Sequence, residues 1–290
     1  MSSGQLAGRR VLVTGAARGI GAATARRLHA RGAHLVLAGI EPDVLGRTAA
    51  ECGDALAVAC DVRDREQVEA AVEAAAEHLG GLDVVVANAG VAAQLPLVGG
   101  NPTVFEQTIE VNLRGVYYTL RAAGAHIAHE RGYALAISSL AAALHPPLLG
   151  AYCASKAGVE ALADVLRIEL HPSGARVGVA YFAELDTDMV RRGYGTAAAK
   201  RLGESPGGAR RVAPLAAGID AIERGIARRS RHVVAPGWVG AVLPVRMLAQ
   251  RAIELATRSQ IQSALEIARA EDAPLTTPQP VPSPERGARP

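Results

Sequence analysis

Short apolar runs alternate with amphipathic, helix-like segments over the first 240 residues of this chain of 290. The runs, such as RRVLVTG at residues 9–15 and LDVVVANAG at residues 82–90, have continuously apolar centres rather than alternating ones. A strand with this pattern has both faces buried, as in a parallel sheet covered by helices on each side. The sequence therefore predicts an α/β fold in which residues 1–240 form a single domain on a doubly wound parallel sheet of about seven strands.

Three further segments depart from this alternation. Residues 188–215 are polar and glycine-rich, and we expect a substrate lid there, with a solvated surface loop as the alternative. Residues 241–271 form a predicted helical C-terminal extension, and the apolar stretch 239–249 could pack on the core, on a partner subunit or on a membrane surface. Residues 272–290 are rich in proline and polar side chains, which predicts a disordered tail.

The composition argues against several functional classes. A net charge of +3 with scattered basic residues does not favour nucleic acid as a partner. The three cysteines have no CxxC spacing and the eight histidines have no ligand-like grouping, so we expect neither a disulfide framework nor a metal site. The N-terminus has no secretory pattern and no apolar run is long enough for a membrane span, which predicts a cytoplasmic protein.

A glycine-rich turn follows the first predicted strand. The stretch VLVTGAARGIG places Gly15, Gly19 and Gly21 between a strand and a helix. Glycines let the backbone turn sharply and approach a ligand closely, and the N-terminus of the following helix presents free N–H groups to a pyrophosphate. Tight turns need glycine in any case, so it is the position after the first strand that indicates dinucleotide binding.

A tyrosine and a lysine stand four residues apart in the stretch AYCASKAG. In a helix, Tyr152 and Lys156 share one face. A phenol has an unperturbed pKa of ~10, and a neighbouring ammonium would lower the pKa of Tyr152 and prepare it for general acid–base catalysis. A pair on an exposed helix surface is the alternative.

Six ordered motifs, TGAARGIG, CDV, ANAG, VNLRG, ISS and YCASK, resemble those of the short-chain dehydrogenase/reductase (SDR) family. The resemblance runs from about residue 8 to 190 and more weakly to about 237. It implies a Rossmann-like fold and an NAD(P)-dependent oxidoreductase that interconverts an alcohol and a ketone or aldehyde by hydride transfer. A catalytically silent dinucleotide-binding sensor or scaffold is the alternative.

The same resemblance implies a catalytic set of Asn112, Ser139, Tyr152 and Lys156. Tyr152 would be the general acid or base, and Ser139 would stabilise charge on the substrate oxygen. Lys156 would also hold the nicotinamide ribose, and Asn112 would hold a water that relays protons to it. The implied cofactor-binding residues are Gly15, Arg18, Gly19, Ile20, Gly21, Gly39, Asp61, Val62, Asn88, Ala89, Gly90, Tyr152, Lys156 and Thr187.

Three of these residues have specific expected roles. Asp61 would accept a hydrogen bond from the adenine amino group, with capping of the following turn as the alternative. Asn88 would tie the sheet edge to the loop beneath the cofactor. Thr187 would hydrogen-bond the nicotinamide carboxamide.

The choice between NADP and NAD depends on the end of the second predicted strand. NAD users of the family carry an acidic residue there, and this chain has Gly39 followed by Ile40. Arg18 matches a basic position that favours NADP in some members, because arginine forms charge-assisted hydrogen bonds with phosphate. Glu41 stands two residues after Gly39 and could serve as the acidic residue that favours NAD. These residues favour NADP over NAD.

The chain departs from the family after the sixth predicted strand, where Phe182 and Ala183 stand in place of Pro-Gly. Phe182 adds apolar bulk near the nicotinamide, which favours an apolar alcohol or carbonyl substrate. Helices expected near 106–130 and 153–171 are apolar on more than one face. In the family, these helices pair across subunits, which implies a homodimer or homotetramer. The physiological substrate and the direction of reaction are not legible from the sequence.

Overall fold

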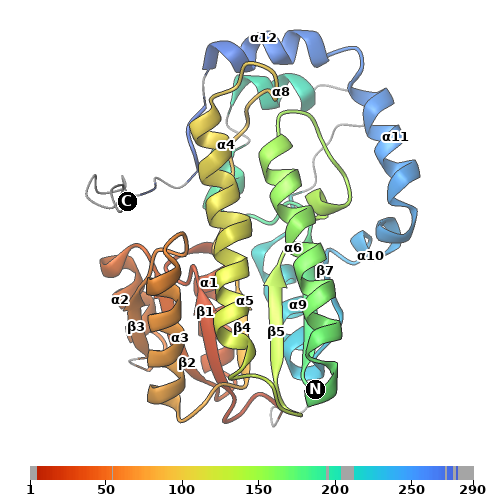
Figure 1. Ribbon diagram of the computed structural model, residues 1–290. Helices are drawn as coiled ribbons and strands as arrows, with labels where there is room; N and C mark the ends of the chain where they lie inside the picture. Colours follow the sequence, from red (N-terminus) through yellow and green to blue (C-terminus); the bar gives the residue numbers. More distant parts are fainter. Residues whose placement is uncertain are drawn as a thin grey trace, which may run out of the picture.

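The computed structural model describes residues 5–53, 55–193, 196–203, 212–271, 273–276 and 279. Within them, one sheet of seven parallel strands has the order β3-β2-β1-β4-β5-β6-β7 (Figure 1). The strands are β1 (Arg10–Thr14), β2 (His34–Gly39), β3 (Leu56–Ala59), β4 (Val84–Ala87), β5 (Tyr133–Ile137), β6 (Arg176–Phe182) and β7 (His232–Ala235). The predicted doubly wound parallel sheet of about seven strands is confirmed.

The strand order reverses at β1. This strand pairs with β2 on one side and with β4 on the other, so that Val11 lies opposite both Leu35 and Val84. Connections leave β1 and β4 in opposite directions at such a switch point, and a crevice forms beyond the carboxyl ends of the two strands. The fold thus places a binding site between the loops that follow β1 and β4.

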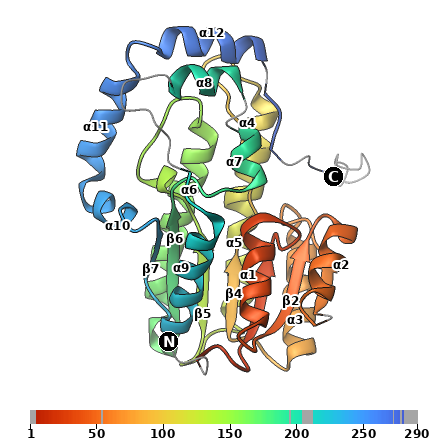
Figure 2. The same cartoon turned by 180° about the vertical axis from the view of Figure 1, so that it is seen from behind.

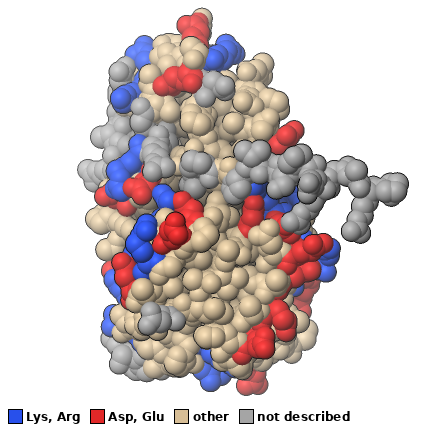
Figure 3. All heavy atoms as spheres, turned by 90° about the vertical axis from the view of Figure 1, so that its left-hand side faces the viewer, with Lys and Arg blue, Asp and Glu red and all other residues tan. Residues whose placement is uncertain are grey.

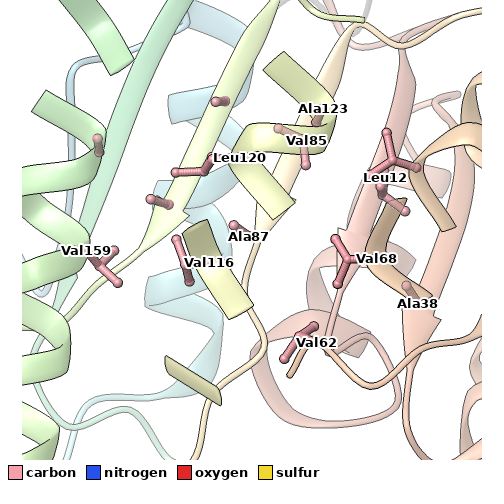
Figure 4. Packing of buried hydrophobic residues seen from close by; sticks show 14 of the residues in the cluster. Leu12, Ala38, Val62, Val68, Val85, Ala87, Val116, Leu120, Ala123 and Val159 are labelled. Carbon is pink, nitrogen blue, oxygen red and sulfur yellow. The ribbon is translucent and has the colours of Figure 1, made fainter. Parts of the chain in front are cut away.

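Helices cover both faces of the sheet (Figures 1 and 2). One face carries α3 (Arg65–Leu79), α5 (Gly115–Gly124) and α6 (Gly150–Glu169), and the other carries α1 (Gly19–His29), α2 (Pro42–Ala50) and α9 (Leu215–Arg228). Successive side chains of a strand point to opposite faces. Leu12 therefore joins the first core, with Val68 of α3 and Leu120 of α5 (Figure 4), whereas Val11 and Val13 join the second. These two dry cores explain the continuously apolar strands.

The helix predicted at residues 106–130 starts earlier and ends earlier than expected. It consists of α4 (Pro102–Ile109), a π-helical turn (Glu110–Arg114) and α5, which ends at Gly124. Asn101 caps the start by accepting a hydrogen bond from the backbone N–H of Thr103. The π-helical turn inserts one extra residue into the helix, and such turns are frequent at functional sites.

The predicted lid region contains two short helices, α7 (Asp188–Gly193) and α8 (Ala197–Gly203). Residues 194, 195 and 204–211 of that region lie outside the described residues. Any closing movement of this region stays a prediction.

The C-terminal extension is helical, as predicted for residues 241–271. It comprises α10 (Val239–Val242), a 3₁₀ turn (Leu243–Val245), α11 (Arg246–Thr257) and α12 (Ile261–Glu271). It runs from the β7 edge along one side of the molecule and across its top, where α12 lies on α8 (Figures 1 and 2). Glu271 of α12 accepts hydrogen bonds from the first backbone N–H groups of α8, on Ala197 and Ala198.

Part of the tail predicted as disordered is held against the domain. Thr276 donates its backbone N–H to the carbonyl of Ala92 at 2.8 Å, and its Oγ1 accepts from the N–H of Ala92 at 3.1 Å. These two hydrogen bonds satisfy the backbone N–H groups of Thr276 and Ala92. The contact of residue 276 with the domain thus differs from the disorder predicted for residues 272–290. Residues 272, 277, 278 and 280–290 lie outside the described residues.

Charged side chains of both signs are interspersed on the surface shown in Figure 3. Among the described residues, no cluster of His, Cys, Asp and Glu is arranged to hold a metal ion. In the same part of the chain, no helix combines the length and apolarity that crossing a bilayer requires.

Candidate active site

A cavity opens at the carboxyl edge of the sheet, beyond the reversal at β1. It is lined by the predicted cofactor-binding residues, with the exception of Gly21, and by Ser139 of the predicted catalytic set. Asn112 lies behind its wall and is fully buried. Residues far apart in sequence therefore converge on one crevice, which extends from Arg18 and Asp61 to Tyr152 and Thr187.

The loop after β1 needs its glycines for two different reasons. Gly15 and Gly19 have φ values of +63° and +56°, which side chains rarely adopt, and Gly19 has open space where a Cβ would be. A Cβ on Gly21 would lie 2.6 Å from Nδ2 of Asn88, so this glycine allows α1 to pack closely against the loop. Gly21 thus shapes the loop from behind the crevice, and its part in cofactor binding stays a prediction.

The loop also fits the pyrophosphate of a dinucleotide. Helix α1 begins at Gly19, and the side chain of its N-cap residue, Arg18, does not cap the free N–H groups of the first turn. These groups and the positive end of the helix dipole attract an anion. The open space at Gly19 lets a phosphate approach the backbone.

Asn88 joins the loops that follow β1 and β4. Its Nδ2 donates to the carbonyls of Thr14 at 3.0 Å and Gly15 at 3.1 Å, and its backbone N–H donates to Oγ1 of Thr14. The two loops are therefore held together beneath the crevice, in keeping with the expected tying role of Asn88.

Arg18 is paired with Glu41 at the far end of the crevice. Nε of Arg18 donates to Oε2 of Glu41 at 2.7 Å, and its Nη2 donates to Oε1 of the same carboxylate. A forked arginine–carboxylate pair is among the stronger charge-assisted contacts. Glu41 thus occupies two of the donors of the guanidinium on which the preference for NADP depends.

Asp61 is also engaged. Its carboxylate accepts from the backbone N–H of Arg63 at 3.0 Å and forms an ion pair with the Arg63 side chain at 2.7 Å. Asp61 therefore caps the following turn, which is the alternative considered for this residue. Asp61 nevertheless lines the crevice.

Three predicted catalytic side chains meet near the end of β5. Tyr152 and Lys156 lie on α6, and Nζ of Lys156 is 5.6 Å from the centre of the Tyr152 ring. Ser139 follows β5, where its Oγ accepts from the N–H of Ala141 at 3.1 Å. Nζ of Lys156 donates to the carbonyl of Ile137 at 2.9 Å. The adjacent Ser138 donates to the carbonyl of Lys156, which is a structural contact.

Burial dominates the acid–base properties of this group. It raises the pKa of the Tyr152 phenol, and the nearby Ser139 hydroxyl offsets this only in part. Burial also lowers the pKa of Lys156 to about 8. The predicted lowering of the Tyr152 pKa is therefore wrong for this structure, because burial raises it and only the Ser139 hydrogen bond acts in the other direction.

Asn112 lies in the π-helical turn between α4 and α5. Its Oδ1 accepts from the N–H of Val91 at 2.8 Å, and its Nδ2 donates to the carbonyl of Val91 and to Oγ of Ser155. A Cβ on Gly90 would lie 3.3 Å from Oδ1 of Asn112 and 3.5 Å from Nζ of Lys156. Asn112 thus fixes the loop after β4 and lies close to Lys156.

A second cavity adjoins the first. The two share Ser139, Tyr152, Phe182, Ala183, Met189 and Val190. The second cavity continues past Tyr152 between apolar side chains, among them Leu144, Leu149, Trp238 and Ile253. A molecule in this cavity would contact the Tyr152 phenol while a dinucleotide lay in the crevice. Phe182 lines both spaces, and its closeness to the nicotinamide stays a prediction.

Several residues that line the two cavities were missed from the sequence. Thr276 lines the crevice, and Gln94, Trp238 and Ile253 line the second cavity. None belongs to a motif. The helical periodicity of the extension indicated that Ile253 is on a helix, but no signal placed that helix beside Tyr152.

Residues 9–201 match the short chain dehydrogenase family. The chain is 37% identical over 216 residues to glycine betaine reductase of Emericella nidulans, a match that covers 73% of this chain and 17% of that protein. It is 36% identical to (-)-trans-carveol dehydrogenase of Rhodococcus erythropolis, over 63% of this chain and 73% of that protein.

Among solved structures, levodione reductase superposes with a TM-score of 0.73 at 26% identity, over 81% of this chain and 98% of that one. The seven-stranded fold, the motifs and the family match agree. The chain belongs to the short-chain dehydrogenase family, which uses NAD or NADP, and is an oxidoreductase that acts on CH–OH groups.

Proposed function

We propose that this protein interconverts an apolar alcohol and its ketone or aldehyde, with Tyr152 as the general acid or base. The observation that carries the proposal is the position of Tyr152 and Ser139 in the shared wall of the two cavities. This position gives the phenol access to a substrate oxygen beside a bound dinucleotide. A dinucleotide-binding sensor would not require a phenol and a serine at this junction.

When bound, the nicotinamide dinucleotide supplies or accepts the hydride. In reduction, the Tyr152 hydroxyl donates its proton to the substrate oxygen, and its raised pKa keeps that proton available at neutral pH. Ser139 donates a hydrogen bond to the same oxygen and stabilises the charge that develops on it. In oxidation, Tyr152 takes the proton of the alcohol.

Lys156 and Asn112 support this proton transfer. Lys156 holds the ribose hydroxyls and, with a pKa lowered to about 8, is able to exchange protons near neutral pH. Asn112 keeps the loop after β4 against α6 through its bonds to Val91 and Ser155. Thr187 lines the crevice and binds the carboxamide of the nicotinamide.

We propose that the crevice accepts both NADP and NAD, and that Arg18 and Glu41 set the preference. Arg18 binds a 2′-phosphate when it exchanges the Glu41 carboxylate for the phosphate. Glu41 accepts from a ribose 2′-hydroxyl, as acidic residues near this position do in NAD-binding folds. The ion pair thus weakens the preference for NADP expected from Arg18.

The test is turnover of a panel of apolar alcohols and ketones with both dinucleotides. Tyr152→Phe removes the proton donor and should lower kcat by at least about 100-fold, while dinucleotide affinity, followed by fluorescence, stays within a few-fold. Tyr117→Phe, on the exposed side of α5, is the matched control and should retain full activity. Tight dinucleotide binding without turnover by the unsubstituted protein would favour the sensor or scaffold.

A further inference from the structure

We infer that Gln94 is a substrate-binding residue whose amide N–H donates a hydrogen bond to a second, uncharged oxygen of the substrate, remote from the oxygen that reacts. The inference rests on the proposed function, because it takes the cavity beside Tyr152 as the substrate site. It names the substrate class as a largely apolar ketone or alcohol that carries a further carbonyl, hydroxyl or ether oxygen.

The first observation is an unpartnered donor in a buried side chain. Gln94 is 6% exposed and lines the second cavity. Its Oε1 accepts from Oγ1 of Thr196 at 2.6 Å, whereas its Nε2 has no hydrogen-bond partner among the described residues. Because Gln94 lines the second cavity, this N–H is available to an acceptor on a molecule bound there.

The second observation is that the amide is held in one orientation. Oγ1 of Thr196 accepts from the backbone N–H of Ala199 at 3.1 Å and donates its own proton to Oε1 of Gln94 at 2.6 Å. The backbone beside Gln94 is fixed as well, because the N–H of Leu95 donates to the carbonyl of Leu148 at 2.9 Å. A side chain held at both ends is a preorganised donor.

The third observation concerns the charge around this donor. Among the described residues that line the second cavity, Glu184 is the only charged one, and no Lys or Arg lines it. A carboxylate on the substrate would find no cation to pair with among these described lining residues. An uncharged oxygen needs no such partner, and the apolar walls accommodate the rest of the molecule.

Two ring ketones that differ by one remote oxygen test the inference. The probes are 1,4-cyclohexanedione and cyclohexanone. Gln94→Met keeps the length of the side chain and removes the donor, so kcat/KM for the dione should fall about tenfold, while that for cyclohexanone should change less than about threefold. The control, Gln262→Met, alters an exposed glutamine of α12 and should change neither. Thermal melting verifies that each variant folds.

A binding measurement keeps this result separate from the proposed function. With the oxidised dinucleotide bound, neither ketone can be reduced, so an NMR titration measures affinity alone. The unsubstituted protein should bind the dione more tightly than cyclohexanone, and Gln94→Met should lose that difference. An unchanged difference in the variant, or none in the unsubstituted protein, overturns the role of Gln94 even if turnover is found. A lost difference without turnover of any substrate supports Gln94 and overturns the proposed reaction.

Discussion

At the scale of single residues, burial rather than pairing controls the acid–base chemistry of the site. Lys156 is 3% exposed, and its ammonium would have to keep its charge without water around it. Its pKa is therefore lowered to about 8, and that of Tyr152 is raised. The motif predicted which residues meet, but their environment decides the direction of each pKa shift.

The raised pKa of Tyr152 predicts different pH profiles for the two directions of the reaction. Reduction needs the protonated phenol, and a raised pKa keeps it protonated through neutral pH, so kcat/KM should stay flat from roughly pH 6 to 9. Oxidation needs the proton-accepting form and should speed up with rising pH over the same range. Initial rates in both directions measure this. A reduction rate that falls between pH 6 and 8 would contradict a raised pKa.

The Arg18–Glu41 pair predicts a two-way change in dinucleotide preference. Glu41→Gln releases the guanidinium and removes a charge that repels a 2′-phosphate, so the affinity for NADPH relative to NADH should rise about tenfold or more. Arg18→Ala should lower that ratio, because the phosphate loses its cation. Fluorescence titrations with both dinucleotides measure the ratio. If Arg18→Ala weakens both equally, Arg18 is not a phosphate ligand.

At the scale of elements, the C-terminal extension is part of the site. Ile253 of α11 and Trp238, just before α10, line the second cavity. Glu271 of α12 holds the start of α8, and Thr196 beside that start holds Gln94. The extension therefore bounds the second cavity directly through these side chains and supports it indirectly through α8.

Shortening Ile253 should change the size of substrate that the cavity prefers. Ile253→Ala removes apolar contacts to a small ring and makes space for a larger one. We expect the ratio of kcat/KM for 4-tert-butylcyclohexanone over cyclohexanone to rise about tenfold. Leu255→Ala, on the exposed side of the same helix, is the control. Equal ratios in the two variants would show that α11 does not bound the substrate.

At the scale of the whole molecule, two sets of exposed apolar side chains are candidates for subunit contact. Val165 and Ile168 lie on α6, one of the helices expected to pair across subunits. Met247 and Leu248 lie on α11, within the apolar stretch 239–249. Packing of this stretch on a partner subunit or a membrane surface was among the alternatives drawn from the sequence. The fold does not by itself choose between these surfaces.

A charge placed on each surface distinguishes them. We expect the protein to run as a homodimer or homotetramer in light scattering coupled to size exclusion, and Ile168→Asp to produce a smaller species, because it buries a carboxylate in an apolar contact. Leu248→Asp is the matched control and should leave the mass unchanged. The reverse result would place the interface on the extension, and a monomeric unsubstituted protein would contradict the expectation.

The sequence by itself determined the parallel sheet, the loop after β1 and the juxtaposition of Tyr152 and Lys156 on α6. These features are legible because each depends on local periodicity, glycine conformation or the spacing of one helical turn. Only the tertiary structure decided that Glu41 occupies Arg18, that Gly21 lies behind the crevice, and that Gln94 and Ile253 face the same cavity as Tyr152. Such contacts join segments distant in the chain, and they exist only where the packing of the sheet, α8 and the extension brings those segments together.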